Sequence, residues 1–152
     1  PWEHTRLGNL VIQATPGADV GQPENGYLLT DLDTESVLYY EPHLSAPTTL
    51  ARLAQQSRVD ALLIPVVGQA FPLMGEVLMG PEKALAVCRA LTPQTVVPTA
   101  LADLDFKGVL PPLIRTVGSL DEFDTLLTQA GLTARLCRPA PGQSVALTAS
   151  RR

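Results

Sequence analysis

Short apolar runs bounded by turn residues recur along the chain, and most are rich in Val, Ile, Leu or Tyr. Runs of this length and composition predict β-strands. The predicted strands are residues 9–14, 26–31, 36–41, 61–66, 95–99, 134–139 and 144–149. The polar, Asp-rich stretch 30–36 predicts a hairpin turn with Asp31 and Asp33 at its tip.

Three longer segments between the later strands carry apolar residues at helical spacing, and they predict helices over residues 47–57, 80–91 and 119–131. Pro81 suits a first helical position, where its missing N–H costs nothing. Ser119 and Glu122 form an S-x-x-E capping box, and Gly131 ends that helix.

The order of elements predicts antiparallel β-structure, then alternating helix and strand, then a closing hairpin. This order is typical of an α/β layered domain, with a mixed sheet and helices on one face, and residues 1–152 form a single domain or half-domain. The apolar segment 68–80, interrupted by Pro72 and Gly75, is either a lid over a pocket or an ordered loop packed on the core. Packing is favoured because apolar loop residues usually bury.

Composition and charge limit the kinds of binding partner that the sequence predicts. The 152 residues are 45% hydrophobic and 17% charged, with a net charge of −4 and only two lysines, so nucleic acid is not an expected partner. No apolar run is long enough to cross a bilayer and no signal-peptide pattern opens the chain, so we expect a cytoplasmic protein without a membrane partner. Cys88 and Cys137 flank no CxxC motif, and free thiols are favoured over a disulfide.

The strongest candidate for a metal-binding or acid–base site is the sequence LYYEPH, residues 38–43. A strand ends at Glu41, and Pro42 directs His43 into the following loop, where α/β proteins place functional side chains. Glu41 and His43 could act as a pair of metal ligands or as a base with its orienting group. In the alternative interpretation Glu41 is solvated, and His43 caps or packs near the helix that starts at Pro47.

Other candidates are weaker. Asp103 and Asp105 follow the strand 95–99; they either bind a divalent ion or make turn hydrogen bonds, and the turn is favoured. The sequence has no G-x-S-x-G motif, no Cys beside a plausible His and no Gly-rich phosphate loop. The only other histidine, His4, belongs to no metal-binding pattern.

Taken together, the turns resemble those of the metallo-β-lactamase superfamily. ATPGADVG, residues 14–21, predicts a strand that enters a Thr15-Pro16-Gly17 turn, and in that family the corresponding turn is followed by a metal-binding histidine. The segments ENGYLL and YYEPH are similar to a branch found in cyanobacteria and plants. The helix and strand over 80–99, the helix at 119–131 and the segment 134–149 resemble the end of the family's fold.

This resemblance implies the second half of an αββα sandwich, in agreement with a chain that opens without an initiator Met. The first half, with its H-x-H-x-D-H motif, would lie outside this chain. We therefore expect the N-terminal half of the same fold, or a homo-oligomer partner, to cover the sheet face left open.

The same resemblance implies a degenerate metal site. Ala18, followed by Asp19, stands at the turn histidine, Ala100 stands at the last histidine, and the acidic ligand position falls within residues 41–43. Glu41 or His43, with residues of the other half, would hold Zn, Mn or Fe. The expected function is hydrolase-like, on an ester, lactone, amide or phosphodiester; the alternative is a non-catalytic binding or assembly module that retains only the fold.

Overall fold

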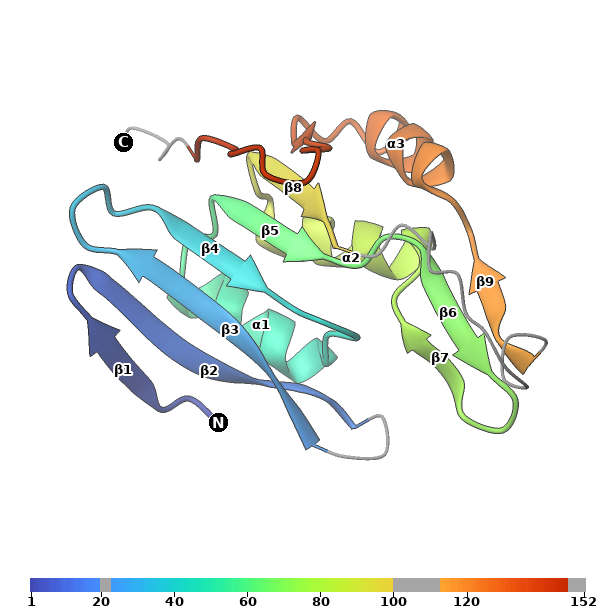
Figure 1. The fold of residues 1–152 in the computed structure, drawn as a ribbon, viewed down its shortest axis with the longest axis horizontal. Coiled ribbons are helices and arrows are strands. Elements are labelled where there is room, and N and C mark those ends of the chain that lie inside the picture. The colour runs from blue at the N-terminus through green and yellow to red at the C-terminus, as the bar shows by residue number, and fades with distance from the viewer. Residues whose placement is uncertain (20–22, 100–112, 148–152) are drawn as a thin grey trace.

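The computed structural model describes residues 1–19, 23–99 and 113–147, and Figure 1 shows their arrangement. A seven-stranded mixed sheet has the order β1-β2-β3-β4-β5-β8-β10. Strands β1 (His4–Leu7), β2 (Leu10–Asp19), β3 (Pro23–Asp31) and β4 (Val37–Tyr40) pair antiparallel in chain order. Strands β5 (Ala61–Ile64), β8 (Thr95–Pro98) and β10 (Arg135–Leu136) continue the sheet in parallel with β4. The predicted mixed sheet is confirmed.

A smaller sheet has the order β7-β6-β9, formed by β6 (Gly68–Phe71), β7 (Gly75–Leu78) and β9 (Arg115–Val117). Strands β6 and β7 form a hairpin, so residues 68–80 are not the ordered loop that the sequence favoured. Val66, Val67 and Met79 at its base are buried, whereas Leu73 at its tip is fully exposed. Gly75 at the tip has a φ of +74°, which permits the tight turn.

The three predicted helices are present as α1 (Pro47–Gln56), α2 (Pro81–Leu91) and α3 (Leu120–Gln129). Pro occupies the first turn of α1 and α2, and the Ser119 hydroxyl accepts the Glu122 N–H at the start of α3. Helix α2 packs against both α1 and α3. The helices lie on one side of the sheet, as predicted, with α1 and α2 behind it in the view of Figure 1.

The strand register defines which side chains face the helices. Leu28 pairs with Tyr39, Tyr39 with Leu62, and Leu62 with Val96, so these four residues form one row on the same face. All four are buried. They join one apolar core with residues of the helices, including Leu53, Leu85, Cys88, Phe123 and Leu127.

The neighbouring row of side chains faces the opposite way and is not covered. Ala14, Tyr27, Tyr40, Leu63 and Val97 pair in succession across β2, β3, β4, β5 and β8. All five are half-buried or exposed, and the rings of Tyr27 and Tyr40 stack with centroids 6.5 Å apart. A pocket of 360 Å³ lies on part of this open face, between residues that include Leu10, Leu29, Leu38 and Leu147. The main sheet therefore has one buried apolar face and one accessible apolar face.

Several details differ from the sequence-based predictions. Strands β1, β6, β7 and β9 were not predicted. The Thr15-Pro16-Gly17 turn is absent, because β2 continues through these residues to Asp19 with a register irregularity after Pro16. A bulge of this kind tolerates proline, which cannot donate to the ladder.

The closing hairpin is also wrong within the described residues. Strand β10 pairs in parallel with β8, and residues 144–147 form no strand. Pro139 and Pro141 lack the N–H groups that a hairpin ladder would need. Both cysteines are free thiols, as favoured from the sequence, with Cys88 buried in the core. No helix in the described part of the chain is long and apolar enough to cross a membrane.

Candidate functional site

The candidate residues Glu41 and His43 follow β4 at the edge where the parallel strands β4, β5 and β8 end. This edge is the usual position of binding sites in α/β sheets. The start of β3 lies at the same edge, because β3 is antiparallel to β4. The loop after β4 therefore meets the β2–β3 hairpin here.

Glu41 lies at the centre of a buried polar cluster. Its side chain is 0% exposed; Oε2 accepts a hydrogen bond from the Tyr39 hydroxyl at 3.0 Å, and Oε1 accepts the His43 N–H at 3.3 Å. The hydroxyls of Thr15 and Ser45 lie near the Tyr39 hydroxyl. Neither of these two hydroxyls makes a well-aligned hydrogen bond with a described residue. The alternative interpretation, in which Glu41 is solvated, is therefore wrong.

Burial dominates the acid–base behaviour of this cluster. Loss of hydration raises the pKa of Glu41 to about 7, against the lowering effect of the His43 and Tyr39 hydrogen bonds. The negative charge of Glu24 raises this pKa further. Burial and the neighbouring Glu41 charge also raise the pKa of Tyr39, so its hydroxyl stays protonated and donates.

His43 occupies a different environment from Glu41. Its Nδ1 atom forms an ion pair with Glu24 Oε2, and the two side chains are 32% and 35% exposed. The His43 carbonyl accepts the Met79 N–H at 3.0 Å, which ties the loop to the end of the β6–β7 hairpin. His43 does not cap α1, because Ala46 is the N-cap residue and makes no side-chain cap.

Two glycines let the backbones of β2, β3 and the loop after β4 lie close together here. A Cβ at Gly26 would lie 2.7 Å from Thr15 Oγ1 and 2.9 Å from Glu41 Oε2. A Cβ at Gly17 would lie 2.9 Å from the Glu24 carbonyl oxygen and 3.5 Å from Glu41 Oε1. Gly17 also forms an isolated antiparallel bridge with Ser45, so the ATPGA segment of β2 lies beside the loop that carries His43.

The remaining sequence-based candidates are distributed as follows. Ala18 is half-buried in β2, and Asp19 ends that strand with a side chain that is not described. Asp103, Asp105 and Ala100 lie outside the described residues. Asp31 and Asp33 are in the β3–β4 turn, as predicted, where Asp31 Oδ1 accepts the backbone N–H groups of Asp33 and Thr34.

Sequence reasoning missed Glu24 and Tyr39. Glu24 contacts His43 because the antiparallel register of β3 and β4 continues past Tyr40, the last residue of β4, and Glu24 lies before the predicted strand 26–31. Tyr39 could have been found from strand alternation, since residues 39 and 41 must face the same side. In the described residues, no group of three or more His, Cys, Asp or Glu side chains could hold a metal ion.

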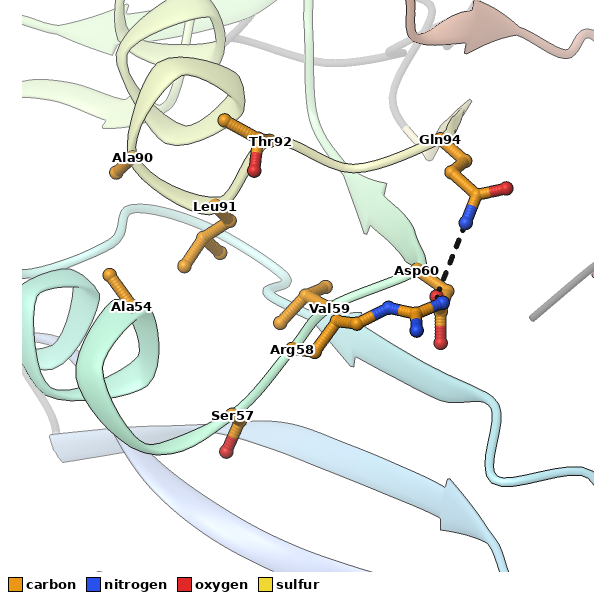
Figure 2. Close-up of a pocket in the computed structure, with 9 residues that line it drawn as sticks. All are labelled: Ala54, Ser57, Arg58, Val59, Asp60, Ala90, Leu91, Thr92 and Gln94. Atoms are coloured by element: carbon orange, nitrogen blue, oxygen red, sulfur yellow. Dashed lines mark hydrogen bonds and ion pairs between the residues drawn. The ribbon is translucent and has the colours of Figure 1, made fainter. Parts of the chain in front are cut away.

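A second polar site lies at the opposite edge of the sheet, where the parallel strands begin. The buried Asp60 carboxylate accepts the Val37 N–H at 2.9 Å and pairs with Arg58 (Figure 2). The Asp60 carbonyl oxygen accepts the N–H groups of Gln94 and Thr95. A pocket of 340 Å³ lies here between the ends of α1 and α2. These bonds fasten the starts of β4, β5 and β8 together, which is a structural role.

The fold and site define a layered α/β protein with its candidate site at the carboxyl ends of parallel strands. Residues 1–100 match a family described as the beta-lactamase superfamily domain. The match covers more than half of the chain, so the protein belongs to this family. No curated protein sequence matches the chain.

Solved structures with the metallo-β-lactamase fold support the same architecture. The isothiocyanate hydrolase from Delia radicum gut bacteria matches with a TM-score of 0.72 at 17% identity, over 95% of this chain and 57% of its own. Igni18, a metallo hydrolase from the archaeon Ignicoccus hospitalis, matches with a TM-score of 0.65 at 20% identity, over 94% of this chain and 57% of its own. YhfI from Bacillus subtilis, a metallo-beta-lactamase fold protein, gives 0.60 at 11% identity, over 91% and 50%. The chain thus spans about half the length of these structures.

Proposed function

We propose that this chain is part of a hydrolase-like protein of the metallo-β-lactamase fold with a degenerate metal site, in which His43 is the ligand that the described residues supply. The observation that carries this proposal is the pairing of His43 with Glu24 at the carboxyl edge of the parallel strands. Metal-binding histidines usually have a carboxylate or carbonyl on one ring nitrogen, which orients the ring and leaves the other nitrogen for the metal. Among the described residues, Nε2 of His43 has no hydrogen-bond partner.

The described residues alone do not fit a complete metal site. His43 is one ligand, and a hydrolytic site needs two or three protein ligands with an open position for water. Both Glu41 oxygens already accept hydrogen bonds from within the chain. The proposal therefore requires further ligands from residues outside the described ranges, such as Asp103 and Asp105, or from another half of the fold.

A divalent ion such as Zn, Mn or Fe, when bound, would lower the pKa of a coordinated water. The names of two similar structures describe a metallo hydrolase and an isothiocyanate hydrolase, and they support the hydrolase class rather than a particular substrate. An ester, lactone, amide or phosphodiester is the proposed substrate range.

The open sheet face supports a second element of the proposal, which concerns assembly. The row from Ala14 to Val97 is apolar and accessible, and the similar structures extend well beyond the part that this chain matches. An uncovered apolar sheet face is unfavourable in water. We infer that the other half of the same fold packs on this face; a second copy of the chain is the competing occupant.

The metal proposal is tested by titrating Zn²⁺, Mn²⁺ and Fe²⁺ into the metal-free full-length protein and measuring the heat of binding. We expect binding that His43→Ala abolishes and that Glu24→Gln weakens about 10- to 100-fold, because Glu24 orients the ring. His4→Ala is the matched control, because His4 is exposed on β1, and it should bind like the wild type.

Two results would contradict the proposal. One is a wild-type protein that binds none of the three ions. The other is binding that His43→Ala leaves intact. Either result would favour the non-catalytic module that keeps only the fold.

A further inference from the structure

Glu41 and His43 are separated by one residue but perform different tasks in the structure. Glu41 extends the row of Tyr39 toward the helix-covered side of the sheet and is completely buried. His43 lies beyond Pro42, with about a third of its side chain exposed. A fully buried residue is poorly placed to bind a ligand that enters at the ends of the strands.

The Glu41 carboxylate instead holds the backbone that carries His43. Its Oε1 atom accepts the His43 N–H, which closes a short turn around Pro42, a residue with no N–H of its own. The His43 carbonyl is fixed from the other side by the Met79 N–H. Both backbone polar groups of His43 are therefore anchored within the chain.

The surroundings of Glu41 are built to fix the carboxylate itself. The Tyr39 hydroxyl holds Oε2 from the same strand face. Gly26 leaves the space beside Oε2, since a Cβ there would lie 2.9 Å from that oxygen, and a Cβ at Gly17 would press on the Glu24 carbonyl oxygen at 2.9 Å. A carboxylate restrained on both oxygens can define the position of the next loop residue.

We propose that Glu41 is a positioning residue for His43, and that it fixes the His43 backbone while Glu24 orients the imidazole. This inference rests on the proposed function only for the role of His43 as a ligand. The placement of the loop by Glu41 is independent of any metal.

The test compares Glu41→Gln and Glu41→Ala in the full-length protein, with the exposed Glu35→Ala as the matched control. The first measurement is hydrogen exchange of the His43 amide in metal-free protein by NMR. The second is the affinity for Co²⁺, with the visible absorption of the bound ion reporting its coordination. The Gln carbonyl can still accept the His43 N–H while its amide group donates to the Tyr39 hydroxyl oxygen.

We expect Glu41→Ala to accelerate exchange of the His43 amide about tenfold and to weaken Co²⁺ binding, because one buried hydrogen bond is lost. Glu41→Gln should keep slow exchange, and it should keep the Co²⁺ affinity and spectrum of the wild type. If Glu41→Ala does not fold, Glu41→Leu replaces it, since leucine fills the buried space and offers no acceptor for the His43 N–H.

Two results would overturn the inference. Unchanged His43 exchange in Glu41→Ala would mean that the carboxylate does not hold the loop. If Glu41→Gln binds Co²⁺ more weakly and with an altered spectrum, while the His43 amide still exchanges slowly, Glu41 would be a ligand. If the wild type binds no Co²⁺, the proposed function fails, and the exchange measurement alone decides the role of Glu41.

Discussion

Gly26 on β3 faces the Glu41 carboxylate at the end of β4, and a Cβ at Gly26 would lie 2.9 Å from Glu41 Oε2. The same atom would lie 2.7 Å from Thr15 Oγ1 and 3.1 Å from the Tyr40 carbonyl oxygen. Thr15 and Glu41 are both 0% exposed, so neither can move into solvent. Glycine is needed at position 26 because a buried polar cluster occupies the space of a side chain.

Gly26→Ala should therefore destabilise the protein by about 1–3 kcal/mol, the usual cost of overpacking a filled interior. The free energy of unfolding in urea measures the effect. Asn25→Ala, at the exposed neighbouring position of β3, is the matched control and should change stability by less than about 0.5 kcal/mol. Equal losses in both variants would mean that β3 adjusts freely and that the cluster is not tightly packed.

The raised pKa of Glu41 predicts that stability falls as pH rises. Burial raises this pKa to about 7 from its ordinary value of 4.5, so the folded protein holds the proton more tightly than the unfolded chain. The stabilising contribution is complete below pH 4.5 and is lost as the pH rises through 7. Its upper limit is on the order of 3 kcal/mol, at about 1.4 kcal/mol per pKa unit.

Urea unfolding of wild type and Glu41→Gln at a series of pH values measures this contribution. Glutamine does not titrate, so the variant should lose most of the decline between pH 4.5 and 7. Parallel pH profiles for the two proteins would show that Glu41 is not the group responsible.

The Asp60 cluster should contribute to stability and not to ligand binding at the opposite edge. Asp60→Ala removes the acceptor of the buried Val37 N–H, and we expect a loss of about 2–3 kcal/mol. Asp33→Ala in the exposed β3–β4 turn is the control and should cost no more than about 0.5 kcal/mol. Metal affinity should be unchanged in both variants; a change in Asp60→Ala would connect the two edges of the sheet.

Much of the fold could be predicted because its information is local. The capping box at Ser119 and the apolar spacing of Phe123 and Leu127 define α3, and both signals act within one or two helical turns. The Asp31 turn is similarly local, since its carboxylate binds the backbone of the next residues. The closing hairpin was wrong for the opposite reason: β10, which lies within the predicted strand 134–139, pairs with β8 about forty residues away along the chain.

The candidate site was predicted only in part for the same reason. The strand end at Glu41 and the break at Pro42 are local signals, and they are the reason why the sequence predicts a site in this loop. Glu24 reaches His43 through the β3–β4 register continued beyond the end of β4, and Thr15 reaches the cluster because β2 does not turn at Pro16. Glu41 is buried by tertiary packing. Strand alternation alone indicates burial for Tyr39, but it does not indicate burial for a charged residue.

The tip of the β6–β7 hairpin should become more stable with a polar residue. Leu73 has a φ of +68° and a fully exposed side chain, a conformation that costs an L-residue roughly 1 kcal/mol. Asn adopts this conformation more readily, so Leu73→Asn should raise the free energy of unfolding by up to about 1 kcal/mol. Met74→Asn is the control and should be neutral. A loss of stability in Leu73→Asn would indicate that Leu73 packs against another surface in the full protein.

Tyr27 provides the sharpest test of whether the open sheet face is covered. In the chain alone it is 37% exposed, stacks on Tyr40 and borders no helix, so an arginine there could remain hydrated. If the other half of the fold packs on this face, Tyr27→Arg buries an unpaired charge and should cost about 3 kcal/mol or more in the full-length protein.

Leu32→Arg is the matched control, because Leu32 is 42% exposed in the β3–β4 turn and should tolerate the charge. Urea unfolding gives the cost, and light scattering gives the mass of each variant. Destabilisation by Tyr27→Arg in a protein that stays monomeric would support a covering layer from the same polypeptide. Conversion of a dimer to a monomer would identify a second copy as the occupant, and equal, small effects of both variants would leave this face in solvent and contradict the inferred assembly.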